Sequence, residues 1–508
     1  MRHPLLLACL LSCTPPTPAL TASPDNTPLT LAPGQAAELS VGADGRATAR
    51  LTTATGSERF VVILASTRFD SVTDAPPTRY TLSSPGPAEA LSPQRVLDGC
   101  AFSSERFSTT ALPTDPAPTG PAPTEGATRT LYVPTGTTTE SIQARALSVG
   151  EHAVIWADTS HPTTLDQAFV LQFRDDFERV ILPRARQVFG TEPDLDHDGR
   201  IQLVFSRLTR ERGVAFFSSC DLNEQLDGCH DSNHGEYLYL TPPDAIDPPY
   251  NTPNAIKEIL AHEVAHLLHF QRKVLRNHLS TWQDPVYLSE GIGALAQDVT
   301  GYQAGNLYVT RAGLDGIDQF SLADLLRRSD DAPEHSKEGV LRGGGYLFVR
   351  YLYDRAGGDA AAGLEIENRG GPTLLRALLD APVWIDQALP RVVSADLADL
   401  ALDFYTALAL SNRDQAGDAR ATNPCFQYLP TLVDPITQKQ RGADLFARFH
   451  GSQMQGPKLG SAQAPDGQLL PGGVDYLSLD ATAGSPDLRL AVQLDPQSAP
   501  RIRIARWK

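Results

Sequence analysis

The sequence predicts an α+β protein in which a mostly helical region lies between short β segments. Apolar residues recur mostly at helical spacing between about residues 253 and 415. Short apolar and β-branched runs bounded by turn formers occur on both sides of that region, as at 60–65 and 474–479. The chain has 508 residues, of which 41% are hydrophobic. That is enough for roughly three domains with buried cores.

Composition excludes several functional classes. The net charge is −17 and no block rich in Lys or Arg interrupts it, so we expect no nucleic-acid partner. None of the six lysines stands in the context of a Gly-rich phosphate loop. The apolar run at 5–11 is far shorter than the ~20 residues that span a bilayer, and no later stretch comes closer. An integral membrane protein is therefore not expected.

The N-terminus has the pattern of a signal peptide over residues 1–13. Arg2 precedes the apolar run, and small residues follow it. Residues 10–13, Leu-Leu-Ser-Cys, also resemble a bacterial lipobox, in which Cys13 becomes lipidated. We expect a secreted or bacterial cell-envelope protein that meets a membrane only through this lipid anchor. A buried N-terminal apolar patch is the alternative, although the Pro-rich sequence that follows suits a tether better.

The rest of the chain divides into five parts by composition. These are a tether at 14–34, a β domain at 35–111, a Pro-rich linker at 112–126, a main domain at 127–430 and a C-terminal β segment at 431–508. In the main domain, ahead of its helical part, we expect strands at 130–133, 153–156, 201–205 and 237–240 and a helix at about 164–189.

Four cysteines remain after the signal peptide, and they allow three pairings. Cys220 and Cys229 bracket a polar loop and are the natural local disulfide in an oxidising compartment. Cys100 would then pair with Cys425 by elimination. A zinc–thiolate site is the competing interpretation, which the absence of C-x-x-C weakens.

The residues that point to chemistry lie on a predicted helix that starts at Thr252 and Pro253, a good cap and a good first residue. The helix contains H-E-x-x-H, with His262, Glu263 and His266. The two histidines lie about 40° apart on the helix and one turn removed, so both rings can reach one ion. Zinc takes neutral nitrogen donors at about 2.0–2.1 Å, which this spacing supplies.

A chance H-E-x-x-H arises in on the order of one in fifty chains of this histidine content. Its context here argues against chance, because apolar residues cover much of the rest of the helix. Buried polar side chains need partners, and a metal suits two imidazoles. Glu263 lies at the edge of that face, where it can take a proton from a zinc-bound water that attacks a carbonyl.

A catalytic zinc usually has three protein ligands. The sequence lacks the third histidine of H-E-x-x-H-x-x-G-x-x-H. A second helix is predicted to begin at Asp284 and Pro285, and after this start Glu290 is its only carboxylate before Asp298. Gly291 and Gly293 each cost roughly 1 kcal/mol in a helix interior, which suggests close approach to the first helix. We expect Glu290 as the third ligand; an ordinary surface glutamate is the alternative.

These motifs resemble those of the gluzincin metallopeptidases, and among them the hyicolysin-like family of secreted bacterial enzymes. The resemblance lies in the sequences at 261–270, 287–291, 194–204 and 343–352, and covers roughly residues 130 to 410. It implies a zincin-like metallopeptidase domain at 127–430. It also implies zinc ligation by His262, His266 and Glu290, with Glu263 as the general base. The family often has an acidic residue where this chain has Gln297, with Asp298 beside it.

Two further features lie near these motifs. Asp194, Asp196 and Asp198 form D-x-D-x-D-G, the first half of an EF-hand loop, but the twelfth position is Phe205. A full EF-hand is excluded, and a weaker Ca²⁺-binding turn and a solvated acidic turn both stay open. His269 shares the metal face two turns from His262, and we favour a supporting or packing role over ligation.

Substrate binding also has candidates. The strand at 236–240 precedes the zinc helix, and as an edge strand it would pair with an extended peptide. An oxyanion needs a donor, and Tyr346, Tyr351 and His335 are all candidates, although such tyrosines are more often core residues.

The sequence therefore predicts an exported zinc metalloendopeptidase acting on protein or peptide substrates. A surface-anchored binding or adhesion lipoprotein with a structural zinc is the alternative from another class. An aminopeptidase ranks lower, because no acidic pair for a free amine is evident.

Overall fold

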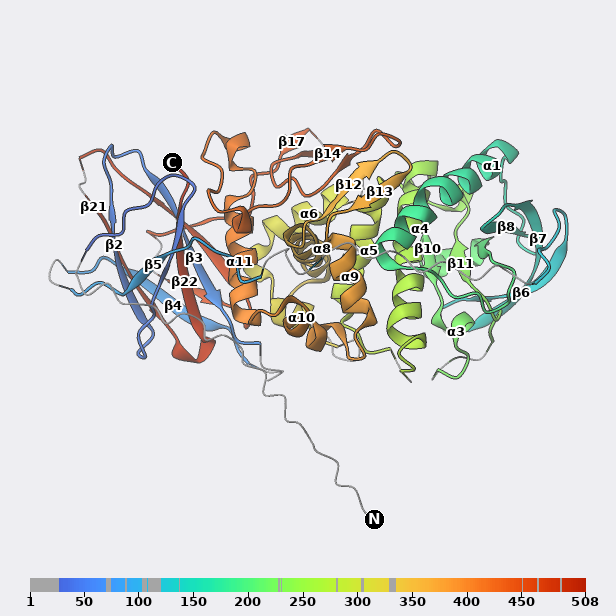
Figure 1. The fold of residues 1–508 in the computed structure, drawn as a ribbon, viewed down its shortest axis with the longest axis horizontal. Coiled ribbons are helices and arrows are strands. Elements are labelled where there is room, and N and C mark those ends of the chain that lie inside the picture. The colour runs from blue at the N-terminus through green and yellow to red at the C-terminus, as the bar shows by residue number, and fades with distance from the viewer. Residues whose placement is uncertain are drawn as a thin grey trace, which may run out of the picture.

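The computed structural model mixes helices and strands, as predicted, in an elongated molecule (Figure 1). A β-sandwich forms one end, helices fill the middle, and a six-stranded sheet with its helices forms the other end. The structure describes residues 27–69, 75–86, 89–102, 107, 120–136, 138–226, 229, 231–279, 282–302, 306–328, 335–449, 451–463, 466–484 and 487–508. The predicted signal peptide with Cys13, and most of the tether and linker, lie outside these residues.

The sandwich combines strands from both ends of the chain. One sheet has the order β18-β20-β3-β22-β1-β5 and the other β19-β4-β21-β2. The strands are β1 (Ala36–Leu39), β2 (Arg46–Thr52), β3 (Arg59–Ser66), β4 (Thr78–Ser83), β5 (Gln94–Val96), β18 (Gly460–Ser461), β19 (Asp466–Leu469), β20 (Val474–Asp480), β21 (Asp487–Leu494) and β22 (Pro500–Arg506). The segments 35–111 and 431–508, expected as separate β units, therefore share both sheets.

Strand β3 explains why the two segments join. It pairs antiparallel with β20 on one edge and with β22 on the other. Its apolar run is buried on both faces: Phe60, Val62 and Leu64 enter the sandwich core, while Val61 and Ile63 enter the main core beside the helices. A strand buried on both faces needs neighbours on both edges, and the N-terminal segment alone does not supply them.

The predicted tether is shorter than expected. Leu29 and Leu31 are 3% and 1% exposed and belong to the sandwich core. Backbone hydrogen bonds join Leu29 to β2: its N–H donates to the carbonyl of Arg50, and its carbonyl accepts from Thr52. Residues 27–34 are thus part of the sandwich, because apolar side chains at this point gain more from burial than from a solvated linker.

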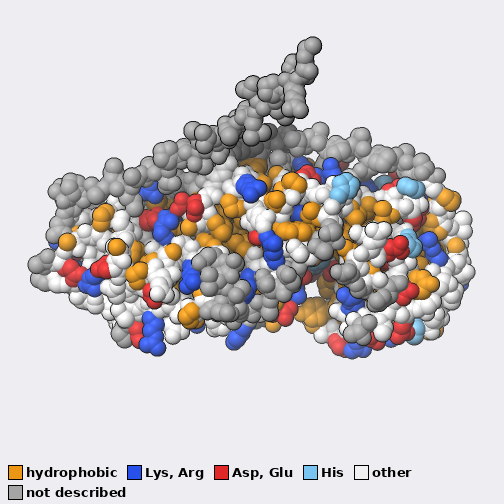
Figure 2. All heavy atoms as spheres, turned by 90° about the horizontal axis from the view of Figure 1, so that it is seen from below, with side chains coloured by type: hydrophobic (Ala, Val, Ile, Leu, Met, Phe, Trp, Pro, Cys, Tyr) orange, Lys and Arg blue, Asp and Glu red, His pale blue; other side chains and the backbone are white. Residues whose placement is uncertain are grey.

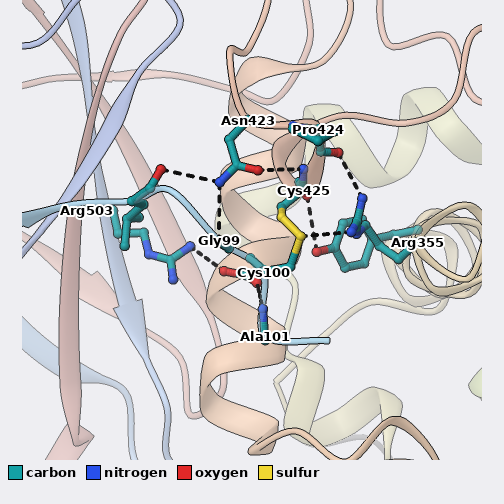
Figure 3. Close-up of a disulfide and its surroundings, with 11 residues drawn as sticks. Gly99, Cys100, Ala101, Arg355, Asn423, Pro424, Cys425 and Arg503 are labelled. Atoms are coloured by element: carbon teal, nitrogen blue, oxygen red, sulfur yellow. Dashed lines mark hydrogen bonds and ion pairs between the residues drawn. A yellow bond between two sulfur atoms is a disulfide. The ribbon is translucent and has the colours of Figure 1, made fainter. Parts of the chain in front are cut away.

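Both predicted disulfides are confirmed, Cys220–Cys229 and Cys100–Cys425. The second joins the segment after β5 to the one after α11 (Leu397–Leu410), across 325 positions of sequence. Around it, Asn423 donates to the carbonyl of Gly99, and Arg355 donates to the carbonyl of Pro424 (Figure 3). The disulfide therefore fastens the sandwich to the helical region.

The second six-stranded sheet has the order β10-β11-β9-β8-β7-β6. Its strands are β6 (Thr128–Pro134), β7 (Thr139–Val149), β8 (Ala153–Asp158), β9 (Ile201–Phe205), β10 (Ala215–Phe217) and β11 (Tyr237–Leu240), which confirms the strands predicted here. Strands β8, β9 and β11 are mutually parallel. The predicted helix at 164–189 consists of α1 (Gln167–Asp176), a π-helical turn and α2 (Leu182–Phe189). These helices and α4 (Pro253–Phe270) share one core with this sheet.

The middle of the molecule is helical, as predicted. Its main helices are α5 (Val286–Thr300), α6 (Asn306–Asp315), α8 (Glu338–Arg355), α9 (Gly371–Asp380), α10 (Ile385–Val393) and α11. Helix α8 packs closely on its neighbours through three consecutive glycines. A Cβ on Gly343 would lie 2.0 Å from the carbonyl oxygen of Val309 in α6, and one on Gly345 would lie 2.7 Å from that of Tyr287 in α5.

In the described part of the chain, no helix is both long and apolar enough to cross a bilayer. On the face seen in Figure 2, the described Lys and Arg side chains are scattered and mixed with Asp and Glu. This face therefore offers no continuous basic surface among its described residues.

The helix packing predicts a contrast between two glycines of α8. Gly343→Ala places its Cβ inside the contact with α6, so we expect a clear fall in the melting temperature. Gly339→Ala is the matched control, because nothing lies within 4 Å of the new Cβ, and it should stabilise the helix by up to ~1 kcal/mol. Thermal unfolding of both variants tests this, and equal melting temperatures would contradict the packing.

Candidate metal centre

Helix α4 carries His262, Glu263 and His266 and is held in place as its sequence predicts. The Thr252 hydroxyl caps it by accepting from the N–H of Ala255 at 3.3 Å, and Pro253 is its first residue. Its apolar side chains are buried in the main core. His262, Glu263 and His266 each offer a ligand atom, and the three atoms lie within 4.8 Å of one another.

Helix α5 brings Glu290 to the same point. Its Oε2 lies 3.3 Å from Nε2 of His262, and its Oε1 lies 3.7 Å from Nε2 of His266. The side chains of His262, His266 and Glu290 are 14%, 17% and 19% exposed, so solvent reaches all three. The carboxylate and the two imidazole nitrogens thus face one another in a partly exposed cluster.

The two glycines beside Glu290 make this approach feasible in different ways. A Cβ on Gly293 would lie 2.5 Å from Cε1 of His262, so this glycine lets α5 lie against the imidazole, as the sequence predicted. Gly291 instead faces α8, where a Cβ would lie 2.6 Å from the carbonyl oxygen of Gly345. The prediction that both glycines face α4 is therefore wrong for Gly291, because α5 is packed between two helices.

Sequence reasoning missed Arg342. This residue lies on α8, and its guanidinium forms an ion pair with Oε2 of Glu290. Its Nε also donates to Glu338 at 3.0 Å. The contact depends on the packing of α8 against α5, so the only local indication was the Glu338–Arg342 spacing of one helical turn.

Burial and the neighbouring charges shift the pKa values of the residues in the cluster in opposite directions. Burial raises the pKa of Glu290, but the hydrogen bond and charge of His262 and the charge of Arg342 outweigh it and hold this pKa well below its ordinary value. Burial also opposes protonation of His262, yet the hydrogen bond and charge of Glu290 raise its pKa. Burial, followed by the charge of His262, lowers the pKa of His266 to about 3. Glu290 is therefore ionised and His266 neutral at pH 7.

Glu263 differs from the three proposed ligands because it accepts a hydrogen bond from the backbone. Its Oε2 accepts a hydrogen bond at 3.0 Å from the backbone N–H of Phe217, in strand β10. Burial raises the pKa of Glu263 to about 7, although the charge of His262 and the bond from Phe217 oppose the shift. A carboxyl group with such a pKa can both accept and return a proton near neutral pH.

His269 supports His266 instead of joining the donors. It is fully buried, and its Nε2 lies 2.7 Å from Oδ2 of Asp284. The Ser289 hydroxyl lies 3.3 Å from Nδ1 of His269 and 3.3 Å from Nδ1 of His266. Asp284 was not predicted to take part, because its contact with His269 depends on the tertiary structure.

These contacts allow one continuous chain of hydrogen bonds from Asp284 to His266. When Nε2 of His269 donates to Asp284 and Nδ1 carries no proton, Nδ1 accepts the Ser289 hydroxyl proton. The Ser289 oxygen then accepts from Nδ1 of His266. In this arrangement His266 has a free lone pair on Nε2, on the side of Glu290. The chain of hydrogen bonds thus orients His266 as a nitrogen donor.

Other predicted residues have partners outside the cluster. The hydroxyl of Tyr346 donates to Asp298 at 3.0 Å, and that of Tyr351 donates to the carbonyl of Cys425 at 3.3 Å. Both tyrosines are buried in the core, so neither is a free donor for an oxyanion. The N–H of His335 donates to Asp324. Asp298 binds Tyr346 and Arg350, not a histidine of the cluster.

The strand predicted to be an edge is internal. Strand β11 pairs with β9 on one side and with β10 on the other, so its backbone is not available to a peptide. The edge next to the cluster is β10, which is only three residues long. The prediction failed because so short a strand has no recognisable alternation in the sequence.

The chain matches no protein-family model, and none of the curated proteins is similar to it in sequence.

The bridging role of Ser289 can be tested by Ser289→Ala. The change leaves Nδ1 of both His266 and His269 without the hydroxyl, so the ring of His266 loses the hydrogen bond that orients it. Loss of such an outer partner typically weakens metal binding about 10–100-fold. Competition titration with a zinc chelator measures the affinity, and thermal unfolding checks that the variant is folded. An unchanged zinc affinity would show that Ser289 does not orient His266.

Proposed function

We propose that this protein is an exported zinc-dependent metalloendopeptidase that hydrolyses peptide bonds of protein or peptide substrates. On this proposal residues 127–430 are a zincin-like domain of the gluzincin type, with His262, His266 and Glu290 as the zinc ligands and Glu263 as the general base. The observation that carries the proposal is the meeting of Glu290, from a second helix, with both Nε2 atoms of the H-E-x-x-H helix.

The donor set suits zinc. Two neutral imidazole nitrogens and one carboxylate are the ligands of many catalytic zinc sites, whereas Ca²⁺ and Mg²⁺ prefer oxygen. The partial exposure of all three side chains leaves a position for water or substrate. When bound, zinc supplies a Lewis acid that polarises a carbonyl and lowers the pKa of a coordinated water.

The protein's own residues would do the remaining work. The hydrogen bond from Phe217 fixes the Glu263 carboxylate, which would take the proton of the attacking water and pass it to the leaving amine. Arg342 would hold Glu290 in its ionised form through the ion pair. The chain Asp284–His269–Ser289 would keep the proton of His266 on Nδ1.

Strand β10 is the proposed place for substrate. It forms the edge of its sheet, and the N–H of Phe217 already contacts Glu263. An extended peptide could add to such an edge through main-chain hydrogen bonds, which would bring its backbone beside the general base. Main-chain pairing of this kind suits an endopeptidase, because it needs no free chain end.

Export is part of the proposal and rests on the sequence at 1–13. Two disulfides support it, since disulfides persist in oxidising compartments. The lipobox-like Cys13 would anchor the protein at the bacterial cell envelope.

The general base is tested by Glu263→Gln. The change keeps the shape of the side chain but removes its capacity to take a proton, so casein cleavage should fall at least about 10²-fold. The zinc content, measured by mass spectrometry of the purified protein, should persist. Glu365→Gln, at an exposed position in the hairpin strand β13 (Glu365–Asn368), is the matched control. Full activity of the Glu263 variant would reject the mechanism, whereas a parent chain that binds zinc but does not cleave casein would favour the binding lipoprotein with a structural zinc.

The third ligand is tested by Glu290→Ala. Without this carboxylate two imidazoles remain, and Arg342 is left beside them without its partner, so the zinc occupancy should fall sharply. The metal content after dialysis against a weak chelator measures this, with the Glu365→Gln variant as the control. Unchanged occupancy would mean that another group completes the site.

A further inference from the structure

A second cluster of acidic side chains lies at the start of strand β9, in the D-x-D-x-D-G turn. The turn is closed by its own carboxylates: Asp194 Oδ1 accepts from the N–H of Gly199 at 3.0 Å, and Asp196 Oδ1 accepts from that of Asp198 at 3.2 Å. Gly199 has a φ of 71°, in the left-handed region that glycine adopts without strain.

The third aspartate of the pattern is occupied within the turn. Oδ1 of Asp198 accepts from the N–H of Arg200 at 2.8 Å, and Oδ2 accepts from the side-chain amide of Gln202 at 2.9 Å. Both of its oxygens thus have donors. The turn by itself offers only Asp194 and Asp196, which explains why the pattern alone was ambiguous.

The structure adds Glu236 to these two residues. Glu236 immediately precedes β11, and its carbonyl accepts from the N–H of Gln202 in β9, at 2.7 Å. Asp194, Asp196 and Glu236 each offer a carboxylate oxygen, and the three oxygens lie within 4.8 Å of one another. The parallel pairing of β9 and β11 therefore supplies the acidic residue that Phe205 fails to supply at the twelfth position of the loop.

Glu236 is the observation that distinguishes this cluster from a solvated acidic turn. The residue is 1% exposed. One carboxylate oxygen accepts from the N–H of Leu195 at 3.0 Å, but Oε2 is buried with no hydrogen-bond partner. A buried carboxylate oxygen without a donor is strongly unfavourable unless a cation satisfies it.

The charges around Glu236 point the same way. Burial, followed by the charges of Asp196 and Asp194, raises the pKa of Glu236 to about 8. The nearby cation, Arg200, is directed elsewhere, since it donates to the carbonyls of Gly150 and Asp198. A divalent cation would relieve both the burial of this carboxylate and the repulsion among the three.

We propose that Asp194, Asp196 and Glu236 bind a calcium ion at the junction of β9 and β11. All three side chains offer oxygen ligands, which Ca²⁺ prefers, whereas zinc sites usually include nitrogen or sulfur ligands. Ca²⁺ also tolerates an irregular arrangement that backbone carbonyls and water complete. The ion joins the loop before β9 to the strand that pairs with β10, and β10 holds Glu263. Calcium thus stabilises the edge of the sheet beside the candidate metal centre.

The experiment uses the full exported chain, with calcium removed by a chelating resin and zinc restored at one equivalent. Titration with CaCl2 should show one bound Ca²⁺ per chain, and the melting temperature should rise with the Ca²⁺ concentration. Glu236→Gln should weaken Ca²⁺ binding at least about tenfold, since it removes one ligand charge. In the absence of Ca²⁺ the same variant should melt no lower than the parent chain, because glutamine keeps the shape of the side chain and does not ionise among the other carboxylates.

Two comparisons make the test specific. The Glu365→Gln variant should bind Ca²⁺ like the parent chain, and so should Glu263→Gln, because the ion does not depend on the hydrolytic mechanism. A melting temperature of the parent chain that does not respond to Ca²⁺ would overturn the proposal. Equal Ca²⁺ binding by the Glu236→Gln variant would also overturn it, as would equally tight binding of Mg²⁺.

Discussion

The close approach of helices α4 and α5 is the constraint on which the candidate metal centre depends. It is possible because Gly293 has no side chain where the ring of His262 lies. Glycine weakens a helix interior by roughly 1 kcal/mol, and here that weakness is the condition for bringing Glu290 to both imidazoles. Through this contact His262 and His266 of α4 and Glu290 of α5 form one group of candidate metal ligands, and this group is partly exposed to solvent.

Helix α8 packs against α5 in the same way, through glycines at the contact. Its glycines let α5 and α6 lie against its backbone, and this packing carries Arg342 to Glu290. The ion pair gives a partly buried carboxylate a permanent positive neighbour, so Glu290 stays ionised although burial opposes it. The cluster therefore contains a carboxylate held in its charged form and a histidine, His266, held neutral, as metal binding requires, whereas the raised pKa of His262 means that a metal would displace a proton there.

Strands from the N-terminal and the C-terminal parts of the described chain form the sandwich together, and the sandwich is joined to the helical region. Strand β3 contributes one face to the sandwich core and the other to the main core, while Cys100–Cys425 fastens the same junction covalently. At the opposite end, the sheet edge at β10 contacts Glu263, and the acidic cluster with Glu236 lies at the start of β11. Both candidate ion sites thus border one sheet, which links the stability of its edge to the geometry of the cluster.

The sequence by itself determined what depends on near neighbours along the chain: the α4 helix with its cap, the spacing of His262 and His266, the principal strands and the acidic turn. Residues one helical turn apart must share a face, whatever the rest of the fold does. The tertiary structure alone decided what depends on packing between distant segments: Arg342 beside Glu290, β10 instead of β11 at the edge, and Glu236 beside the acidic turn. Such contacts are set by how helices and strands pack in three dimensions, and no local periodicity encodes that packing.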